Sequence, residues 1–358
     1  MGMNTSREQE ILNSIHSLVE EYCTLVHSPK PFIPGTTPVR YAGRVFGSEE
    51  VNNAVTASLQ FWLTYGPFEK EYKEQFRTIM NDRHVILTNS GSSANLLAIS
   101  ALTSKRLEER LHPGDEVITV AAGFPTTVAP ILQNSLVPVF VDVELGHYNI
   151  NAHSLPEALS TKTRAIMIAH TLGIPFDIDS IVSFAKENNL YLVEDTCDAL
   201  GSTWDGKLLG TFGDISTFSH YPPHHITMGE GGTVTTNSGR LKREIESFRD
   251  WGRDCWCDTG KNNTCGKRFG WKLGSLPEGY DHKYVYGNIG YNLKGTDFGP
   301  AIGLAQLKRL PHFTQRRKEN ATLYSERLQQ YQEFLQLPST HPKADPSWFA
   351  YPITVHEQ

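Results

Sequence analysis

The segment HVILTNSGSSAN (residues 84–95) places an apolar strand, a Gly/Ser turn and the start of a helix in direct succession. Helical patterns of the same kind, as at 93–107 and 178–188, lie between short runs rich in β-forming residues. Those runs cover residues 84–87, 116–120, 137–143, 165–169, 190–193 and 215–218. This alternation predicts an α/β domain with a mostly parallel sheet covered by helices.

Elements on either side of this region complete the expected organisation. Apolar residues recur at helical spacing through residues 8–27 and predict an amphipathic leading helix. Cys23 lies close to its apolar stripe, and we expect its side chain to take part in core packing. A Pro-rich connector follows. Further helices are expected at 239–251, 296–310 and 313–335, and a strand at 348–355. We therefore divide the chain into residues 1–40 (helix and connector), 41–310 (large domain) and 311–358 (start of a small domain).

Composition limits the class of protein. The 358 residues carry 33 basic and 39 acidic side chains, for a net charge of −6, whereas nucleic-acid or membrane-surface binding favours a concentrated basic patch. We find no apolar stretch of about 18 residues that would span a membrane. The N-terminus is polar and lacks a signal-peptide core. We expect a cytoplasmic protein in a reducing environment.

The turn of residues 88–95 is a candidate anion site. Glycine permits close approach, and the start of a helix offers unpaired N–H groups whose dipole favours a phosphate. An ordinary Gly/Ser loop that binds no anion is the alternative interpretation of these residues. Asp195 closes the apolar strand 190–193, and such positions at the carboxyl end of a parallel strand point into the crevice where ligands bind. A helix N-cap is the alternative role for Asp195.

Four of the five cysteines form a second candidate site. Cys197 lies two residues beyond Asp195, while Cys255, Cys257 and Cys265 share one later segment. Because a single residue separates Cys255 from Cys257, an extended backbone projects both side chains to one side. Four thiolates suit a structural zinc ion or an iron–sulfur cluster, and unligated thiols remain the third interpretation.

The segment SHYPPHH (residues 219–225), followed by GEGG (229–232), resembles the vitamin B6-dependent nucleotide-sugar aminotransferases. In that family a lysine that anchors the cofactor stands where this chain has His224. An imidazole has no primary amine and cannot form a Schiff base with pyridoxal. It can transfer protons near neutral pH, since its ordinary pKa is about 6.5. The exchange predicts a site for proton abstraction in place of covalent anchoring.

This resemblance implies an aspartate-aminotransferase-like (fold type I) large domain and a set of cofactor contacts. The phosphate of pyridoxamine phosphate (PMP) or pyridoxal phosphate (PLP) would be held by serines, the pyridine nitrogen by a carboxylate, and the ring by an aromatic side chain. An asparagine would reach the phosphate from a second subunit, which implies a homodimer. The implied residues are Ser92, Ser93 and Ser219 (phosphate), Asp195 (ring nitrogen), Phe124 (stacking) and Asn292 (second subunit).

His224 together with the cysteine spacing resembles one branch, the CDP-4-keto-6-deoxyglucose 3-dehydratases. That branch implies a 2Fe-2S cluster on Cys197, Cys255, Cys257 and Cys265, with His224 as the base. The implied reaction is C-3 deoxygenation of a nucleotide-linked 4-keto-6-deoxyhexose in deoxysugar biosynthesis. The electrons would come from a separate NADH-dependent flavin and iron–sulfur reductase.

Two departures from the family pattern are visible. His220 stands where the family commonly has phenylalanine, which would reshape the wall of the site. The family continues for several dozen residues beyond position 358, so we expect the small C-terminal domain to be incomplete here. Asp198 and Tyr221, beside Cys197 and His224 in the sequence, are candidates to orient the base or the sugar.

Three other functions remain open on the sequence. One is a cluster-free 3-dehydratase that regenerates its cofactor amine from glutamate. The second is an ordinary PLP-dependent sugar aminotransferase, disfavoured because no lysine occurs between Ser219 and Gly232. The third is a zinc-stabilised binding protein without catalysis. Red-brown colour with equal iron and sulfide would favour the cluster enzyme over all three.

Overall fold

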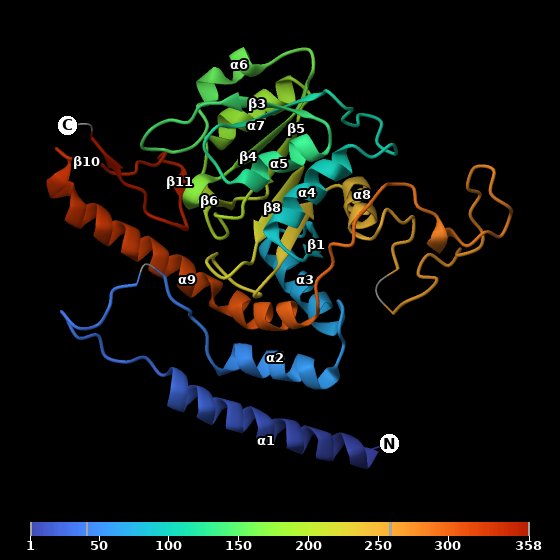
Figure 1. Cartoon of the computed structure of the whole chain (residues 1–358), viewed down its shortest axis with the longest axis horizontal. Helices are drawn as coiled ribbons and strands as arrows, with labels where there is room; N and C mark the ends of the chain where they lie inside the picture. Colours follow the sequence, from blue (N-terminus) through green and yellow to red (C-terminus); the bar gives the residue numbers. More distant parts are fainter. Residues whose placement is uncertain (1, 41, 258–259, 357–358) are drawn as a thin grey trace.

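A seven-stranded sheet forms the centre of the computed structural model, which describes residues 2–40, 42–257 and 260–356 (Figure 1). The strand order is β1-β9-β8-β5-β4-β2-β3. Strand β9 runs antiparallel to β1 and β8, and the remaining neighbours are parallel. The strands are β1 His84–Thr88, β2 Glu116–Val120, β3 Val137–Val141, β4 Thr163–Ala169, β5 Tyr191–Asp195, β8 Ile215–Ser219 and β9 Gly232–Thr236.

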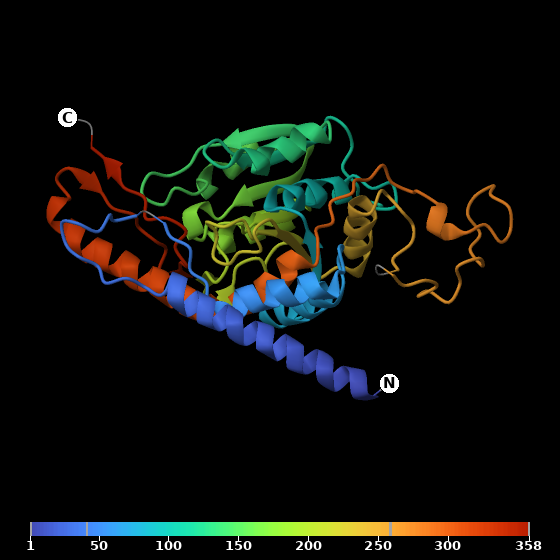
Figure 2. The same cartoon turned by 60° about the horizontal axis from the view of Figure 1, so that its bottom comes forward.

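Helices cover both faces of this sheet (Figures 1 and 2). Buried residues of α4 and α8 pack on one part of the sheet, those of α7 on the β4–β5 region, and those of α3 and α9 on β1 and β8. The helices are α1 Gly2–His27, α2 Ser48–Gln60, α3 Pro67–Ile79, α4 Gly91–Leu102, α5 Pro125–Gln133, α6 Leu155–Ala158, α7 Ile178–Glu187, α8 Gly239–Arg249 and α9 Phe298–Leu328.

Smaller pieces of sheet lie outside this core. Short strands β6 (Thr203–Trp204), β7 (Lys207–Leu208) and β11 (Ala344–Asp345) form one, and β10 (Leu335–Gln336) pairs with β12 (Thr354–Val355). An irregular segment between α8 and α9 projects from the side of the domain in Figures 1 and 2. This segment carries Cys255, Cys257 and Cys265.

The expected α/β domain with a mostly parallel sheet is confirmed. Each of the six predicted strands is present within a few residues of its expected bounds. Strand β9 was not expected, because Gly232–Thr236 contains mostly Gly and Thr and lacks an apolar run. It is nevertheless fully buried between β1 and β8. Pairing with these two strands makes the segment a strand, although its composition does not predict one.

The expectation of two helices at 296–310 and 313–335 is wrong. Helix α9 continues through Pro311 as a single element. Proline removes one backbone hydrogen bond inside a helix, but α9 packs along α2 and α3, and its Leu304, Leu307 and Leu310 share a buried cluster with α3. The expected strand at 348–355 is also largely wrong, since only Thr354–Val355 is a strand. The boundary proposed at 310/311 lies inside α9, and the division into domains stays a prediction.

The N-terminal helix was correctly expected. Helix α1 packs beside α2, and the Cys23 side chain is 8% exposed at that contact, which confirms its packing role. Among the described residues, we find no helix that is both long and apolar enough to cross a membrane.

Candidate active site

The predicted phosphate turn lies where the carboxyl end of β8 meets the start of α4. A Cβ atom added to Gly91 would lie 2.5 Å from Cβ of Ser219, so only glycine allows this approach. Gly232, in the GEGG motif, likewise packs directly against the backbone of Ser90. The two glycines therefore bring Ser219 and the first turn of α4 to one edge of the sheet.

Ser90 caps helix α4. Its hydroxyl accepts a hydrogen bond from the backbone N–H of Ser93 (3.1 Å) and donates one to the hydroxyl of Ser93 (3.0 Å). The side chain of Ser92 is exposed and lies 3.3 Å from the hydroxyl of Thr126. Two hydroxyls and a helix N-terminus thus form a concentration of donors suited to an anion. The role of Ser90 as the cap was not predicted from the sequence.

Asp195 is held in a buried hydrogen-bond network at the end of β5. Its carboxylate, 4% exposed, accepts hydrogen bonds from Asn95 (2.8 Å) and from the Thr127 hydroxyl (2.7 Å). The backbone N–H of Cys197 donates to its other oxygen (3.2 Å). Thr217 donates to the amide oxygen of Asn95 and so fixes the amide orientation. The sequence did not predict the roles of Asn95, Thr127 and Thr217. These residues lie on three separate elements, α4, α5 and β8, which only the fold brings together.

His224 lies beside this carboxylate. Burial lowers the pKa of His224 to about 4, and the Asp195 charge opposes this effect without cancelling it. The imidazole is therefore neutral near pH 7 and able to accept a proton. Its Nδ1 lies 3.5 Å from Asp198, longer than a good hydrogen bond, and has no hydrogen-bond partner among the described residues. The Phe349 ring lies 5.1 Å from the imidazole centroid.

Asp198 shares this environment. Burial, and next the charge of Asp195, raise the pKa of Asp198 to about 7. The sequence placed Asp198 near the base, and the structure confirms that proximity. Tyr221, the other candidate, is half exposed, and its backbone carbonyl accepts a hydrogen bond from the N–H of His224 (3.0 Å).

The two neighbouring histidines occupy different, fully enclosed positions. His220 Nε2 lies 2.8 Å from the Thr233 hydroxyl and 3.4 Å from that of Tyr72. His225 Nε2 lies 2.5 Å from the Ser347 carbonyl, which ties the loop to the C-terminal segment. Both rings are at most 2% exposed, whereas the His224 side chain is 14% exposed. His224 is therefore the most accessible of the three.

The two remaining residues that were predicted to contact the cofactor lie on exposed segments. Phe124 is 68% exposed and precedes Pro125, the first residue of α5. Asn292 is exposed, and the adjoining Leu293 carbonyl accepts a hydrogen bond from the Asn89 N–H in the phosphate turn (2.8 Å). Stacking by Phe124 and a contact from Asn292 to a second subunit stay predictions.

The structure does not assemble the four cysteines. No group of three or more potential metal ligands occurs in residues 2–40, 42–257 and 260–356. Cys257 accepts a hydrogen bond from the N–H of Thr264 (3.4 Å), and Cys265 lies 3.8 Å from His282 Nε2. Burial, reinforced by Asp195, raises the pKa of Cys197 well above its ordinary value. As they lie here, the thiols do not fit a four-thiolate cluster.

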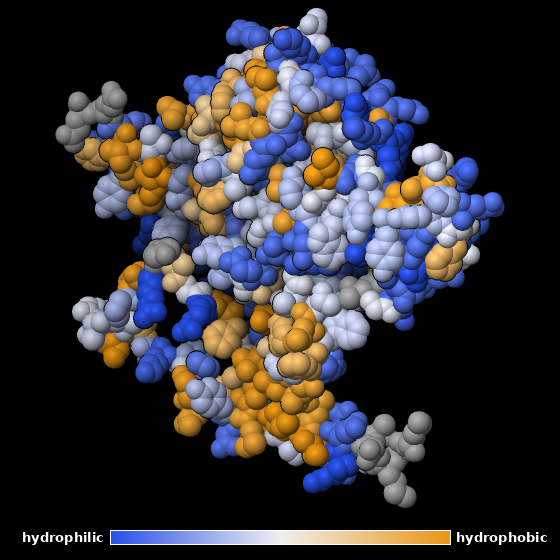
Figure 3. Space-filling model, turned by 45° about the vertical axis from the view of Figure 1, so that its right-hand side comes forward, coloured by the Kyte–Doolittle hydropathy of each residue, from blue (hydrophilic) through white to orange (hydrophobic). Residues whose placement is uncertain are grey.

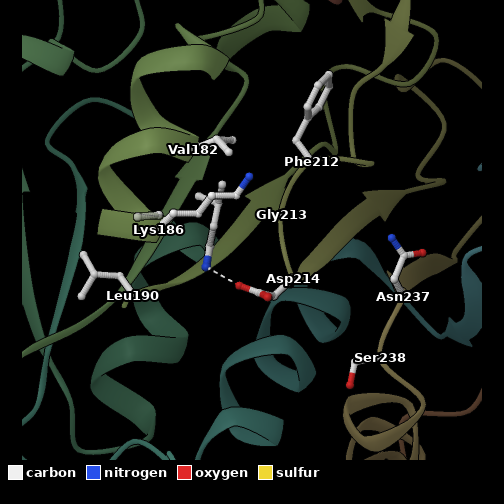
Figure 4. A pocket seen from close by; sticks show the side chains of 10 residues that line it. Val182, Lys186, Leu190, Phe212, Gly213, Asp214, Asn237 and Ser238 are labelled. Atoms are coloured by element: carbon white, nitrogen blue, oxygen red, sulfur yellow. Dashed lines mark hydrogen bonds between the residues drawn. The ribbon is translucent and has the colours of Figure 1, made fainter. Parts of the chain in front are cut away.

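A cavity of about 480 Å³ lies away from these residues (Figure 4). It is formed between α7 and the segments that lead into β5, β8 and α8, near the amino ends of the parallel strands. Asp214 in its wall accepts a hydrogen bond from the backbone N–H of Leu192 (2.9 Å). None of the predicted site residues lines this cavity, and ligands of parallel sheets bind at the opposite, carboxyl edge.

The fold, together with the residues at the carboxyl edge of the sheet, defines the class of protein. Residues 46–358 match the model of the DegT/DnrJ/EryC1/StrS aminotransferase family. The chain belongs to that family and has the fold type I aminotransferase architecture. It is 55% identical over 358 residues to the lipopolysaccharide biosynthesis protein RfbH of Salmonella typhimurium strain LT2, covering 100% of this chain and 81% of that protein.

Two further proteins extend the comparison. The dTDP-4-dehydro-2,6-dideoxy-D-glucose 3-dehydratase of Saccharopolyspora spinosa is 52% identical over 338 residues, which cover 94% of this chain and 73% of that enzyme. A solved structure of GDP-4-keto-6-deoxymannose-3-dehydratase, with a trapped PLP-glutamate geminal diamine, superposes with a TM-score of 0.79. It is 28% identical and covers 89% of this chain and 80% of that chain.

Proposed function

We propose that this protein is a nucleotide-sugar 3-dehydratase that removes the C-3 oxygen of a nucleotide-linked 4-keto-6-deoxyhexose. PMP would be its non-covalently bound cofactor, and His224 its proton-transfer residue. The observation that carries the proposal is the position of His224, which is 14% exposed and has its Nδ1 3.5 Å from Asp198, in the segment that resembles the family's lysine motif. The dehydratase names of two similar proteins support the same reaction class.

The residues at the carboxyl edge fit this cofactor. The close approach of Gly91 to Ser219 places the Ser219 hydroxyl beside the N-terminus of α4, and the two together suit its phosphate. The buried Asp195 carboxylate suits a protonated ring nitrogen, because a buried charge requires a partner of opposite charge. PMP, when bound, would supply a primary amine for the sugar ketone and a ring that accepts electrons.

Within such a site, His224 acts as base and then as acid. Its imidazole is neutral and 14% exposed, so it can take up a proton. The same residue returns the proton to the departing 3-hydroxyl oxygen. Asp195 keeps its position through Asn95 and Thr127, so the carboxylate does not turn toward the imidazole.

The deoxygenation consumes two electrons, which two sources could supply. The cysteine pattern favours a 2Fe-2S cluster on Cys197, Cys255, Cys257 and Cys265, supplied with electrons by an NADH-dependent flavin and iron–sulfur reductase. The described residues do not gather these thiols, so their arrangement does not by itself support a cluster. The second candidate is a glutamate-dependent 3-dehydratase, favoured by the PLP-glutamate adduct held by a similar enzyme.

Anaerobic turnover with CDP-4-keto-6-deoxyglucose and PMP tests the proposal. One reaction contains NADH and a flavin/iron–sulfur reductase, a second contains glutamate, and a third contains neither. We expect loss of the 3-oxygen in the first or the second reaction. Turnover with the reductase, together with equal iron and sulfide in the purified protein, would assign the cluster route. Turnover with glutamate alone would assign the second candidate. Amino transfer to C-4 without loss of the 3-oxygen would contradict both.

A further inference from the structure

Trp251 has a backbone conformation that bulky residues rarely adopt. It lies in the turn that follows α8, with a φ of 64°, and its side chain is 42% exposed. Its N–H donates a hydrogen bond to the Tyr291 carbonyl (2.6 Å), and the Asn288 carbonyl leaves no room for a Cβ atom on Gly252. The fold thus holds this turn in a strained conformation and exposes the indole ring. Strain of this kind occurs mostly at functional sites.

Two cations lie against the Trp251 ring. The Nζ atom of Lys294 is 3.8 Å from the ring centroid, and the Cζ atom of Arg253 is 4.6 Å from it. Because both groups lie against one ring, the two charges are neighbours. Burial lowers the pKa of Lys294 although Asp250 opposes this effect, and the charges of two neighbouring arginines add to it. The turn therefore concentrates positive charge beside an exposed aromatic side chain.

One carboxylate in this turn serves two cations. Asp250 lies 2.9 Å from Lys294 and 3.1 Å from Arg249. The other acids near Arg249 are Glu69 and Glu246, and each pairs with a lysine four residues away on its own helix. Positive charge therefore exceeds negative charge at this turn even before Arg253 is counted.

Arg253 lacks a partner of opposite charge. It forms no ion pair within residues 2–40, 42–257 and 260–356, and its buried Nε has no hydrogen-bond partner there. The next residue, Asp254, pairs with Arg106 instead. Removing a charged group from water is costly unless an opposite charge compensates. The half-buried guanidinium is therefore suited to an anionic ligand.

This turn lies beside the candidate cofactor site. The Leu293 carbonyl, next to Lys294, accepts a hydrogen bond from the Asn89 N–H in the phosphate turn (2.8 Å). Arg249 donates one to the Leu87 carbonyl, near the carboxyl end of β1 (3.2 Å). Figure 3 brings forward the side from which the segment between α8 and α9 projects, and most side chains there are hydrophilic, whereas hydrophobic ones gather at the end where α1 lies. A charged ligand suits these surroundings better than an apolar one.

We propose that Arg253 and Lys294 bind the diphosphate of the nucleotide-linked sugar, with Trp251 as their rigid support. This inference rests on the proposed function, which requires such a substrate. The cofactor phosphate already has donors at the N-terminus of α4, so a second anion site at this edge suits a second ligand that carries phosphate. A diphosphate has more than one negative charge to match two cations, and the planar guanidinium binds phosphate oxygens in pairs.

Isothermal titration calorimetry on the full chain tests this assignment. CDP, dTDP and GDP are titrated separately, and PMP and glutamate are titrated in parallel. Arg253→Gln and Lys294→Gln each remove one cation, whereas Arg253→Lys keeps the charge without the planar group. Arg327→Gln, at an exposed position of α9, is the matched control. Urea unfolding establishes that each variant folds, and Arg253→Gln is the decisive variant because it breaks no ion pair of the described chain.

We expect the nucleoside diphosphate that the parent binds most tightly to bind Arg253→Gln and Lys294→Gln roughly tenfold to a hundredfold more weakly, the scale of a hydrogen bond to a charged group. Arg253→Lys should have an intermediate affinity. The control, and the PMP affinity of every variant, should stay within about threefold of the parent.

Parent-like nucleotide affinity in Arg253→Gln would overturn the proposal, and so would a parent that binds none of the three nucleotides. A fall in PMP or glutamate affinity alone would assign the cations to the cofactor or to an amino donor, and would also overturn it. These measurements involve no turnover. Absence of deoxygenation with the expected binding pattern intact would therefore contradict the proposed function and leave the diphosphate site standing.

Discussion

Gly91 and Ser219 approach so closely that a Cβ atom on Gly91 would lie 2.5 Å from Cβ of Ser219. The two residues are far apart in the sequence and are brought together by α4 and β8. Because one side of this contact is the start of a helix, their approach creates a site at which an anion meets both the helix terminus and a hydroxyl. Binding of the proposed cofactor's phosphate depends on this contact.

Gly91→Ala should separate these two elements. Overpacking of a closely packed contact costs about 1–3 kcal/mol, and here it would also displace the phosphate donors. We expect a lower free energy of urea unfolding and at least a roughly tenfold weaker affinity for PMP, followed by absorbance titration. Gly43→Ala is the control, since nothing lies within 4 Å of a Cβ atom there. Parent-like PMP affinity in Gly91→Ala would argue against the phosphate assignment.

Thr127→Val tests the network that holds Asp195. The substitution keeps the side-chain shape but removes a hydrogen bond to a buried carboxylate, which typically contributes about 1.5–3 kcal/mol. We expect a comparable fall in the free energy of unfolding and weaker PMP binding. Thr119→Val is the matched control, because the Thr119 hydroxyl is buried without a hydrogen-bond partner among the described residues. Equal effects of the two substitutions would contradict the role of Thr127.

Stability should fall in mild acid because buried histidines are neutral in the folded chain. Burial lowers the pKa of His220 and of His225 to about 3, below the ordinary value near 6.5. Between these values the unfolded chain binds protons that the folded chain does not. The stability that these two histidines contribute is therefore complete above about pH 6.5 and falls as pH decreases, by up to about 1.4 kcal/mol per pH unit for each histidine.

His225→Gln should reduce the slope of unfolding free energy against pH by the contribution of one histidine. Urea unfolding from about pH 7.5 to pH 5 measures the slope of unfolding free energy against pH. His153→Gln, at an exposed position, is the control and should leave the slope unchanged. The explanation fails if His225→Gln and the parent have the same slope, whatever their absolute stabilities.

The sequence predicted the sheet and the position of Asp195 because both depend on local patterns. Apolar runs mark the strands, and a carboxylate after such a run lies at the carboxyl edge of a parallel sheet. It did not predict Asn95 and Thr127 as partners of Asp195, since those contacts join distant segments through the fold. Strand β9 was missed for a related reason, because its burial comes from neighbouring strands and not from its own composition.

The helix and cysteine predictions show two further limits. The sequence predicted two helices on either side of Pro311, yet α9 is one continuous helix. The spacing of four cysteines predicted a shared ligand set, whereas the described structure does not gather three of them. Spacing along the chain restricts which thiols can meet, but the position of the irregular segment between α8 and α9 decides whether they do.

The central claim is that His224 transfers the proton that permits loss of the 3-oxygen. Its most direct test compares the parent and His224→Asn in anaerobic turnover of CDP-4-keto-6-deoxyglucose with PMP and whichever electron source, reductase or glutamate, supports turnover of the parent. We predict that His224→Asn binds PMP with parent-like affinity but loses at least roughly a hundredfold in rate, the scale of general acid–base catalysis. Turnover of His224→Asn at the parent rate would contradict the claim.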